Sequence, residues 1–196
     1  KTCTTIQIIR ERCKEEGIVR STLILAPLIV LNNWRKEFAM FSNIDQAQIV
    51  VLEGPVKKRI EKIRLMQNFR CIFITNYDVM QDENLVSAIK DWGPEILVCD
   101  ESHNLKNFKS KRAKAVAEIA DYRTVRHRYM LTGTPILNNA MDLFMQFRIM
   151  DGYLGKYSTF GSNFYAFQSA FFRDENASWR GSNNYYPSWV PREGAY

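Results

Sequence analysis

The sequence predicts an α/β protein in which a mainly parallel β-sheet carries helices on both faces. Short aliphatic runs alternate along the chain with segments of helical periodicity, and such alternation implies right-handed crossovers between parallel strands. The runs themselves, such as ILVC at residues 96–99, are apolar without alternation, as expected for strands covered on both faces. The 196 residues fit one domain with a substantial core.

Each expected element follows from local sequence. In the first segment, residues 2–20, Ile6, Ile9 and Cys13 recur at helical spacing, and Gly17 is a suitable helix end. Pro27 stops the first apolar run, and helical periodicity then resumes. The expected strands cover residues 22–26, 48–52, 71–75, 96–99 and 129–131, and the later helices cover residues 29–41, 56–69, 83–90, 113–120 and 138–150.

Four of these strands end in polar or turn-forming residues. Because the carboxyl ends of parallel strands share one edge of a sheet, these turns are expected to form a single extended site. The turns are Pro27, Thr75-Asn76-Tyr77, Asp100-Glu101-Ser102 and Thr132-Gly133-Thr134.

Asp100 and Glu101 are the strongest chemical signal in these turns. An aspartate at a strand end can hold a hydrated magnesium ion, and a neighbouring glutamate can orient or deprotonate a water. The alternative is that DESH, residues 100–103, forms only a polar turn after a strand. For the TGTP turn, residues 132–135, the alternative is a tight turn whose Gly133 permits a positive φ.

Composition limits the function classes. The net charge of +6 and the pI near 9.2 suit a polyanionic partner such as nucleic acid, although a solvated basic surface gives the same numbers. The best phosphate-facing candidates lie in the basic stretch 106–114 and are Lys106, Lys109, Lys111, Arg112 and Lys114. A solvated helix face is the alternative for this stretch. No apolar run approaches the ~20 residues that span a bilayer. The four cysteines form no CxxC pair, so we expect reduced core residues of a cytosolic protein.

Two aromatic groups need separate interpretation. Leu31, Trp34 and Phe38 recur at helical spacing, which places Trp34 in the core. After about Gly152 the chain becomes rich in phenylalanine and then in Asn, Ser, Gly and Pro. We expect a peripheral helix and an irregular, aromatic-packed extension over residues 152–196, in preference to a platform that stacks nucleotides.

The ordered motifs together resemble a known family. They are KT at Lys1, LILAPLIVLNNWRKEF from Leu23, ITNY from Ile74, CDESHNLKN from Cys99 and LTGTPILNN from Leu131. This set resembles the first RecA-like lobe of superfamily-two helicase-like ATPases, a P-loop NTPase fold, and is most similar to the Swi/Snf-type branch. The resemblance covers about residues 1–172 and implies a three-layer RecA-like lobe over residues 1–151.

The resemblance assigns a role to each residue of the nucleotide site. Lys1 and Thr2 look like the end of a Walker A loop, in which the lysine reaches the phosphates of ATP and the hydroxyl binds Mg²⁺. Asp100 would also hold Mg²⁺, Glu101 would position the attacking water, and His103 would couple hydrolysis to a second lobe.

The remaining carried-over roles concern relay and DNA. Thr132, Gly133 and Thr134 look like the motif that relays the nucleotide state. Pro27 with Trp34, and Asn76 with Tyr77, match segments that line the DNA backbone in the family. Contacts of this kind would bind duplex DNA without regard to sequence and would be sensitive to salt.

The sequence also departs from the family pattern. The glycine-rich loop and the strand before it are absent, and so is the second RecA-like lobe that supplies an arginine finger. We therefore expect the chain alone to be a very poor ATPase. We also expect the sheet to lack a central strand and to carry a slot in its place.

The resulting hypothesis is the N-terminal ATPase lobe of an ATP-dependent DNA translocase. A strand-separating helicase or a restriction-system motor would share these motifs, and a non-catalytic docking lobe is the alternative from another class. A small-molecule P-loop kinase would have no use for the TGTP turn, residues 132–135. The expected location is the cytoplasm of a bacterial or phage-infected cell, or the nucleus of a eukaryotic one.

Overall fold

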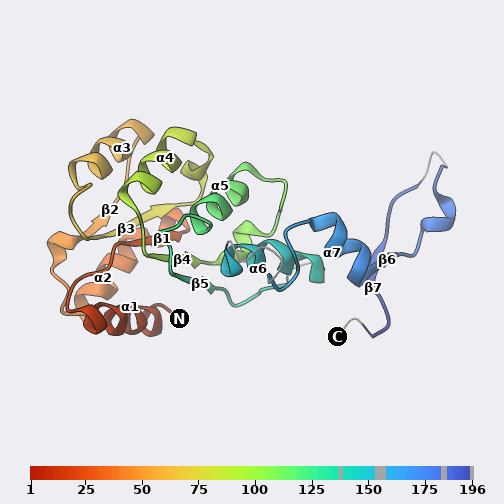
Figure 1. Ribbon diagram of the computed structural model, residues 1–196, viewed down its shortest axis with the longest axis horizontal. Coiled ribbons are helices and arrows are strands. Elements are labelled where there is room, and N and C mark those ends of the chain that lie inside the picture. Colours follow the sequence, from red (N-terminus) through yellow and green to blue (C-terminus); the bar gives the residue numbers. More distant parts are fainter. Residues whose placement is uncertain (137–138, 153–157, 182–184, 195–196) are drawn as a thin grey trace.

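A five-stranded parallel sheet forms the centre of the protein (Figure 1), with strands in the order β2-β3-β1-β4-β5. The computed structural model describes residues 1–136, 139–152, 158–181 and 185–194. The strands are β1 (Thr22–Ala26), β2 (Ile49–Val51), β3 (Ile72–Asn76), β4 (Ile96–Asp100) and β5 (His127–Leu131). All five expected strands are therefore confirmed, with small differences at their ends.

Helices cover both faces of this sheet. On one face lie α1 (Thr2–Glu16) and α2 (Leu31–Phe41); on the other lie α3 (Val56–Leu65), α4 (Glu83–Trp92), α5 (Lys111–Ala120) and α6 (Leu143–Asp151). Short 3₁₀ helices connect them: η1 (Leu28–Val30), η2 (Gln46–Gln48), η3 (Asp78–Gln81), η4 (Ser102–Leu105), η5 (Ala140–Asp142) and η7 (Ala177–Trp179). The three-layer α/β fold is thus confirmed.

The first helix ends at Glu16, as the expected stop at Gly17 predicts, because Gly17 adopts the left-handed conformation, with φ 70°, and its N–H caps the helix. Another expected helix is shorter than predicted. The helix at 56–69 ends at Leu65, and Phe69 beyond it is 65% exposed, so no burial extends the helix. Within the segment expected to be helical at 138–150, Asn138 lies outside the described residues and Leu143 begins the α-helix.

Alternate residues of each strand divide the core into two halves. In β1, Leu23 and Leu25 pack under α3, α4 and α5, whereas Ile24 packs against α1 and α2. Both sets are fully buried, which explains why the strands read as continuous apolar runs. At the ends of these strands the side chains turn polar, and there the site forms.

The expected slot in the sheet is wrong. β1 pairs directly with β3 and with β4, and β4 pairs with β5, so the described sheet is continuous. β5 is an edge strand whose residues are all partly exposed. The sequence argument failed because apolar strand patterns do not reveal strand order; any strand that joins this sheet adds at an edge.

The aromatic-rich extension packs against the main body. Helix α7 (Phe164–Phe171) follows as expected, and Phe167 and Phe172 are buried in the same hydrophobic cluster as the strands. Phe108 stacks on Phe164 with ring centroids 3.7 Å apart. An antiparallel pair was not expected in the tail: β6 (Phe172–Asp174) joins β7 (Trp189–Pro191).

The cysteine expectation is only partly met. Cys13, Cys71 and Cys99 are buried thiols, but Cys3 is exposed because it lies on the outer side of the first turn of α1. Burial raises the pKa of the Cys71 thiol to about 12. Among the described helices, none is long and apolar enough to cross a bilayer.

Candidate nucleotide site at the strand ends

Strand β4 delivers Asp100 and Glu101 to the carboxyl edge of the sheet. Asp100 is the last residue of the strand and is 8% exposed. Glu101 then adopts a left-handed backbone, with φ 48° and ψ 54°, and is the one non-glycine residue with positive φ in the described chain. Such a conformation costs about 1–3 kcal/mol and tends to mark functional sites.

Lys1 lies against this acidic pair. Its Nζ is 2.7 Å from Oε1 of Glu101, and Asp100 also contributes to the field around the ammonium. A Cβ added at Gly133 would lie 4.0 Å from the same Nζ. The chain start, the end of β4 and the turn after β5 therefore converge, as the strand order requires.

His103 connects the acidic loop to the turn after β5. Its Nδ1 lies 3.2 Å from Oγ1 of Thr132 and 3.3 Å from Oε2 of Glu101. The same Thr132 hydroxyl accepts the backbone N–H of Thr134 at 3.1 Å. The residues predicted to bind the nucleotide and those predicted to relay its state thus form one contact network, in which the side chain of His103 is about a quarter exposed.

Two buried groups that support this loop were not singled out for it from the sequence. Trp34 is 1% exposed, which confirms its place in the core, but its indole Nε1 also donates to Oδ2 of Asp100 at 3.0 Å. Tyr77 donates its hydroxyl proton to the backbone oxygen of Asp100 at 2.6 Å. The only available signal was that buried Trp and Tyr need polar partners.

Gln146 was missed altogether. This residue of α6 is 5% exposed, accepts a hydrogen bond from Ser102 at 2.8 Å, and donates to the carbonyls of Pro135 and Asp142 at 2.7 and 3.1 Å. It therefore ties the loop after β4 to the turn after β5. A glutamine within an apolar helix carries no motif, so sequence spacing could not identify it.

Comparison with known proteins agrees with this geometry. A family model described as the SNF2-related domain matches residues 1–180. The chain belongs to this family. The SNF2-related chain is 31% identical over 170 residues to "Protein CHROMATIN REMODELING 20" of Arabidopsis thaliana, and 32% identical over 171 residues to "Transcriptional regulator ATRX homolog" of Drosophila melanogaster. These alignments cover 78% and 77% of this chain but 11% and 13% of the relatives.

Solved structures show the same lobe. The "Sulfolobus solfataricus SWI2/SNF2 ATPase core in complex with dsDNA" superposes with a TM-score of 0.68 and 31% identity, covering 87% of this chain and 32% of that one. The Hef helicase domain of Pyrococcus furiosus, with a TM-score of 0.54, 17% identity and coverage of 76% and 30%, shows the fold alone. The SNF2-related chain is therefore a RecA-like lobe that spans about a tenth of the curated relatives above.

The donor set of this SNF2-related lobe fits magnesium held together with a phosphate ligand. No group of three or more His, Cys, Asp or Glu side chains in the described part could hold a metal alone. Mg²⁺ prefers one or two carboxylates plus substrate phosphates, and Asp100 offers one carboxylate beside Lys1. Thr2 directly follows Lys1 as the first residue of α1, so its hydroxyl is the other candidate ligand.

The four candidate DNA-contacting residues differ in accessibility. Pro27 is partly exposed and directly precedes η1, in which Ile29 is 90% exposed. Asn76 is 5% exposed and accepts a hydrogen bond from Arg59 at 2.8 Å. Lys106 pairs with Asp142 at 3.7 Å, whereas Lys109 is exposed with its Nζ 5.6 Å from the centroid of the Phe108 ring. Their DNA-binding role stays a prediction.

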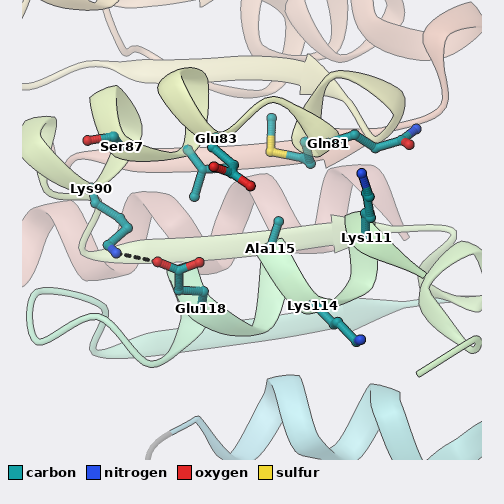
Figure 2. A pocket seen from close by; sticks show the side chains of 10 residues that line it. Gln81, Glu83, Ser87, Lys90, Lys111, Lys114, Ala115 and Glu118 are labelled. Carbon is teal, nitrogen blue, oxygen red and sulfur yellow. Dashed lines mark hydrogen bonds and ion pairs between the residues drawn. The ribbon is translucent and has the colours of Figure 1, made fainter. Parts of the chain in front are cut away.

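A separate groove of about 500 Å³ lies between α4 and α5. Figure 2 shows Lys90 and Glu118, 2.5 Å apart, at one end and Gln81 with Lys111 at the other. None of the strand-end residues described above lines this groove, and its walls carry both signs of charge. This groove is therefore separate from the candidate nucleotide site at Lys1 and Glu101.

The Lys1–Glu101 pair predicts a small pH effect on stability. The hydrogen bond from Lys1 lowers the pKa of Glu101, and the same bond raises the pKa of Lys1. Glu101 contributes to the free energy of unfolding above its unfolded pKa, and this contribution is lost as pH falls through the lower folded pKa. Lys1 contributes below its unfolded pKa, and its contribution is lost as pH rises through the raised folded pKa. The pair therefore acts fully between about pH 4.3 and pH 10.4.

Glu101→Gln should test this effect. Since the two side chains are 45% and 34% exposed, we expect the variant to change the free energy of unfolding by less than about 1 kcal/mol at pH 7. Urea denaturation at several pH values would measure it. The difference between the two proteins should shrink as pH falls through the lowered pKa of Glu101, and a difference that stays constant from neutral to strongly acidic pH would contradict the assignment.

Proposed function

We propose that this chain is the N-terminal ATP-binding lobe of an ATP-dependent DNA translocase of the Swi/Snf type. The observation that carries the proposal is the 2.7 Å contact of Lys1 with Glu101 beside Asp100. A lysine, a strand-end aspartate and a glutamate in contact are the parts that phosphoryl transfer to water needs. The relay residue Thr132 joins them through His103.

The proposed division of labour follows from chemistry. The Lys1 ammonium neutralises charge on the β- and γ-phosphates of ATP. Because a triphosphate carries more negative charge than one carboxylate, it displaces Glu101 from Lys1. Glu101 then accepts a proton from the attacking water. Asp100 and Thr2 would hold Mg²⁺, and the bound ion would supply charge stabilisation at the phosphates. His103 and the turn at Thr132 report the state of this site.

Duplex DNA is the proposed track. The solved relative from Sulfolobus was obtained in complex with dsDNA, and the carboxyl edge of the sheet here carries the candidate contacts Pro27, Asn76, Lys106 and Lys109. The arginine finger would come from a second RecA-like lobe of the full-length protein. Since the curated relatives reported above come from Arabidopsis thaliana and Drosophila melanogaster, we favour a nuclear location over a bacterial or phage-infected cell.

DNA binding by the chain itself should be weak and strongly salt-dependent. We expect the double change Lys106→Gln and Lys109→Gln to reduce the slope of log K against log salt by about 2, because each phosphate contact contributes about 0.9. Fluorescence anisotropy with a labelled duplex at several salt concentrations measures this slope.

Lys14→Gln is the matched control for this experiment. Lys14 lies in the last turn of α1, which points away from the carboxyl edge, and pairs with Glu11. A loss of slope in the control equal to half that of the double variant would show that binding is diffuse.

The function is tested by ATP hydrolysis in the full-length protein that carries this chain. We expect duplex DNA to stimulate hydrolysis, and a displacement assay to leave the duplex intact. Displacement of a strand would instead favour the helicase alternative. DNA binding with no nucleotide binding at all would favour the docking lobe and would overturn the proposal.

A further inference from the structure

Trp34 donates a hydrogen bond to a carboxylate of the site from inside the core. Its indole Nε1 is 3.0 Å from Oδ2 of Asp100, and the ring is 1% exposed. The contact joins α2, on one face of the sheet, to the end of β4. A buried indole N–H needs a hydrogen-bond acceptor. Here the acceptor is the carboxylate of Asp100, which is also the candidate ligand for Mg²⁺.

Trp92 shows the ordinary arrangement in the same molecule. It is 6% exposed, packs on Phe73, and donates its Nε1 proton to the backbone oxygen of Phe69 at 3.3 Å. Trp34 likewise lies near a phenylalanine, Phe38. Both tryptophans are therefore buried beside a phenylalanine, and they differ in the acceptor of the indole proton.

Both oxygens of the Asp100 carboxylate have a fixed donor. Oδ2 accepts from Trp34, and Oδ1 accepts the backbone N–H of Glu101 at 3.0 Å. A carboxylate rotates easily about its last bond, because that torsion is broad. Two donors at 3.0 Å hold its plane, and each oxygen keeps a further lone pair for a ligand.

We propose that Trp34 is a positioning residue for ATP hydrolysis, whose indole N–H sets the orientation in which Asp100 meets Mg²⁺. The inference rests on the proposed function of this site. Groups that orient a metal-binding side chain in this way typically change metal affinity or activity by about 10- to 100-fold when they are removed. Trp34→Phe removes the donor and keeps an aromatic ring in the core.

The first experiment measures magnesium dependence of nucleotide binding in the full-length protein. A fluorescent ADP analogue is titrated at increasing Mg²⁺ concentration, and again in EDTA. We expect Trp34→Phe to raise the Mg²⁺ midpoint about 10-fold and to leave binding in EDTA unchanged. Hydrolysis should show the same shift in Mg²⁺ dependence, with little change in the KM for ATP at saturating Mg²⁺.

Trp92→Phe is the control, because it removes an equally buried indole whose acceptor is a backbone carbonyl. We expect it to lower the melting temperature by a similar amount and to leave the Mg²⁺ midpoint unchanged. Equal Mg²⁺ midpoints in the two variants would overturn the positioning role of Trp34 but would leave the proposed function intact. A wild-type protein that binds no nucleotide would overturn the proposed function as well.

A second measurement needs no metal and no activity. In ¹⁵N-labelled chain, the indole resonance of Trp34 is assigned by its loss in Trp34→Phe, or from backbone assignments if that variant does not fold. We expect Asp100→Asn to move this resonance upfield, since a neutral amide is a weaker acceptor than a carboxylate, and to leave that of Trp92 in place. An unmoved Trp34 resonance would overturn the proposal.

Discussion

Glu101→Gln is expected to lower ATP hydrolysis by the full-length protein about 10²- to 10⁴-fold, because the amide cannot accept the proton of the attacking water. Nucleotide binding should change little. The side chain keeps its size, and its amide oxygen can still accept the hydrogen bond that Lys1 donates at 2.7 Å. Steady-state hydrolysis with saturating duplex DNA, together with nucleotide binding at equilibrium, measures the two effects separately.

Glu118→Gln provides the control for this substitution. Glu118 also accepts from a lysine, Lys90, at 2.5 Å, but it lies in the groove between α4 and α5. Its replacement should leave hydrolysis unchanged. If both variants hydrolyse ATP at the wild-type rate, Glu101 is not the base, and the water must be activated by another group.

Phe167→Ala is expected to destabilise the chain by about 3–5 kcal/mol, the range for removing a large buried aromatic side chain. Phe167 is 4% exposed and contacts a set of other rings. Those rings belong to Phe144 of α6 and to Phe160, Phe164, Phe171 and Phe172. Removing this ring would therefore leave a cavity where the extension meets α6. Urea denaturation followed by circular dichroism gives the free energy of unfolding.

The neighbouring Tyr165 is the matched control. It lies on the same helix, α7, but is 60% exposed, so Tyr165→Ala should cost less than about 1 kcal/mol. The pair also tests the expected boundary at residue 152. If Phe167→Ala melts only the extension and leaves the unfolding of the sheet unchanged, residues 152–196 form a separate unit.

The strands and most helices could be predicted because the apolar pattern of each segment reflects which of its faces are buried. Residues 96–99 are apolar throughout since both faces of β4 are covered, and Gly17 ends α1 by its left-handed backbone. The convergence of the polar turns also followed, because parallel strands share an edge. The magnesium-binding chemistry of Asp100 also followed from its place at a strand end, whereas the role of Lys1 came only from the resemblance.

The rest depends on contacts between segments distant in sequence. Trp34 and Asp100 are separated by 66 residues, and apolar periodicity says nothing about which polar atom an indole meets. The order of strands in the sheet likewise cannot be deduced from the sequences of the strands. The prediction of a missing central strand was therefore wrong. The β6–β7 pair was missed because Phe172–Asp174 and Trp189–Pro191 are three-residue strands without alternation.

The buried carboxamide of Gln146 has a mechanical consequence. It is bonded to Ser102 on one side and to Pro135 on the other, so neither loop can shift alone without breaking a hydrogen bond in a buried environment. While these bonds are kept, any displacement of the acidic loop would have to carry the neighbouring turn and α6 with it.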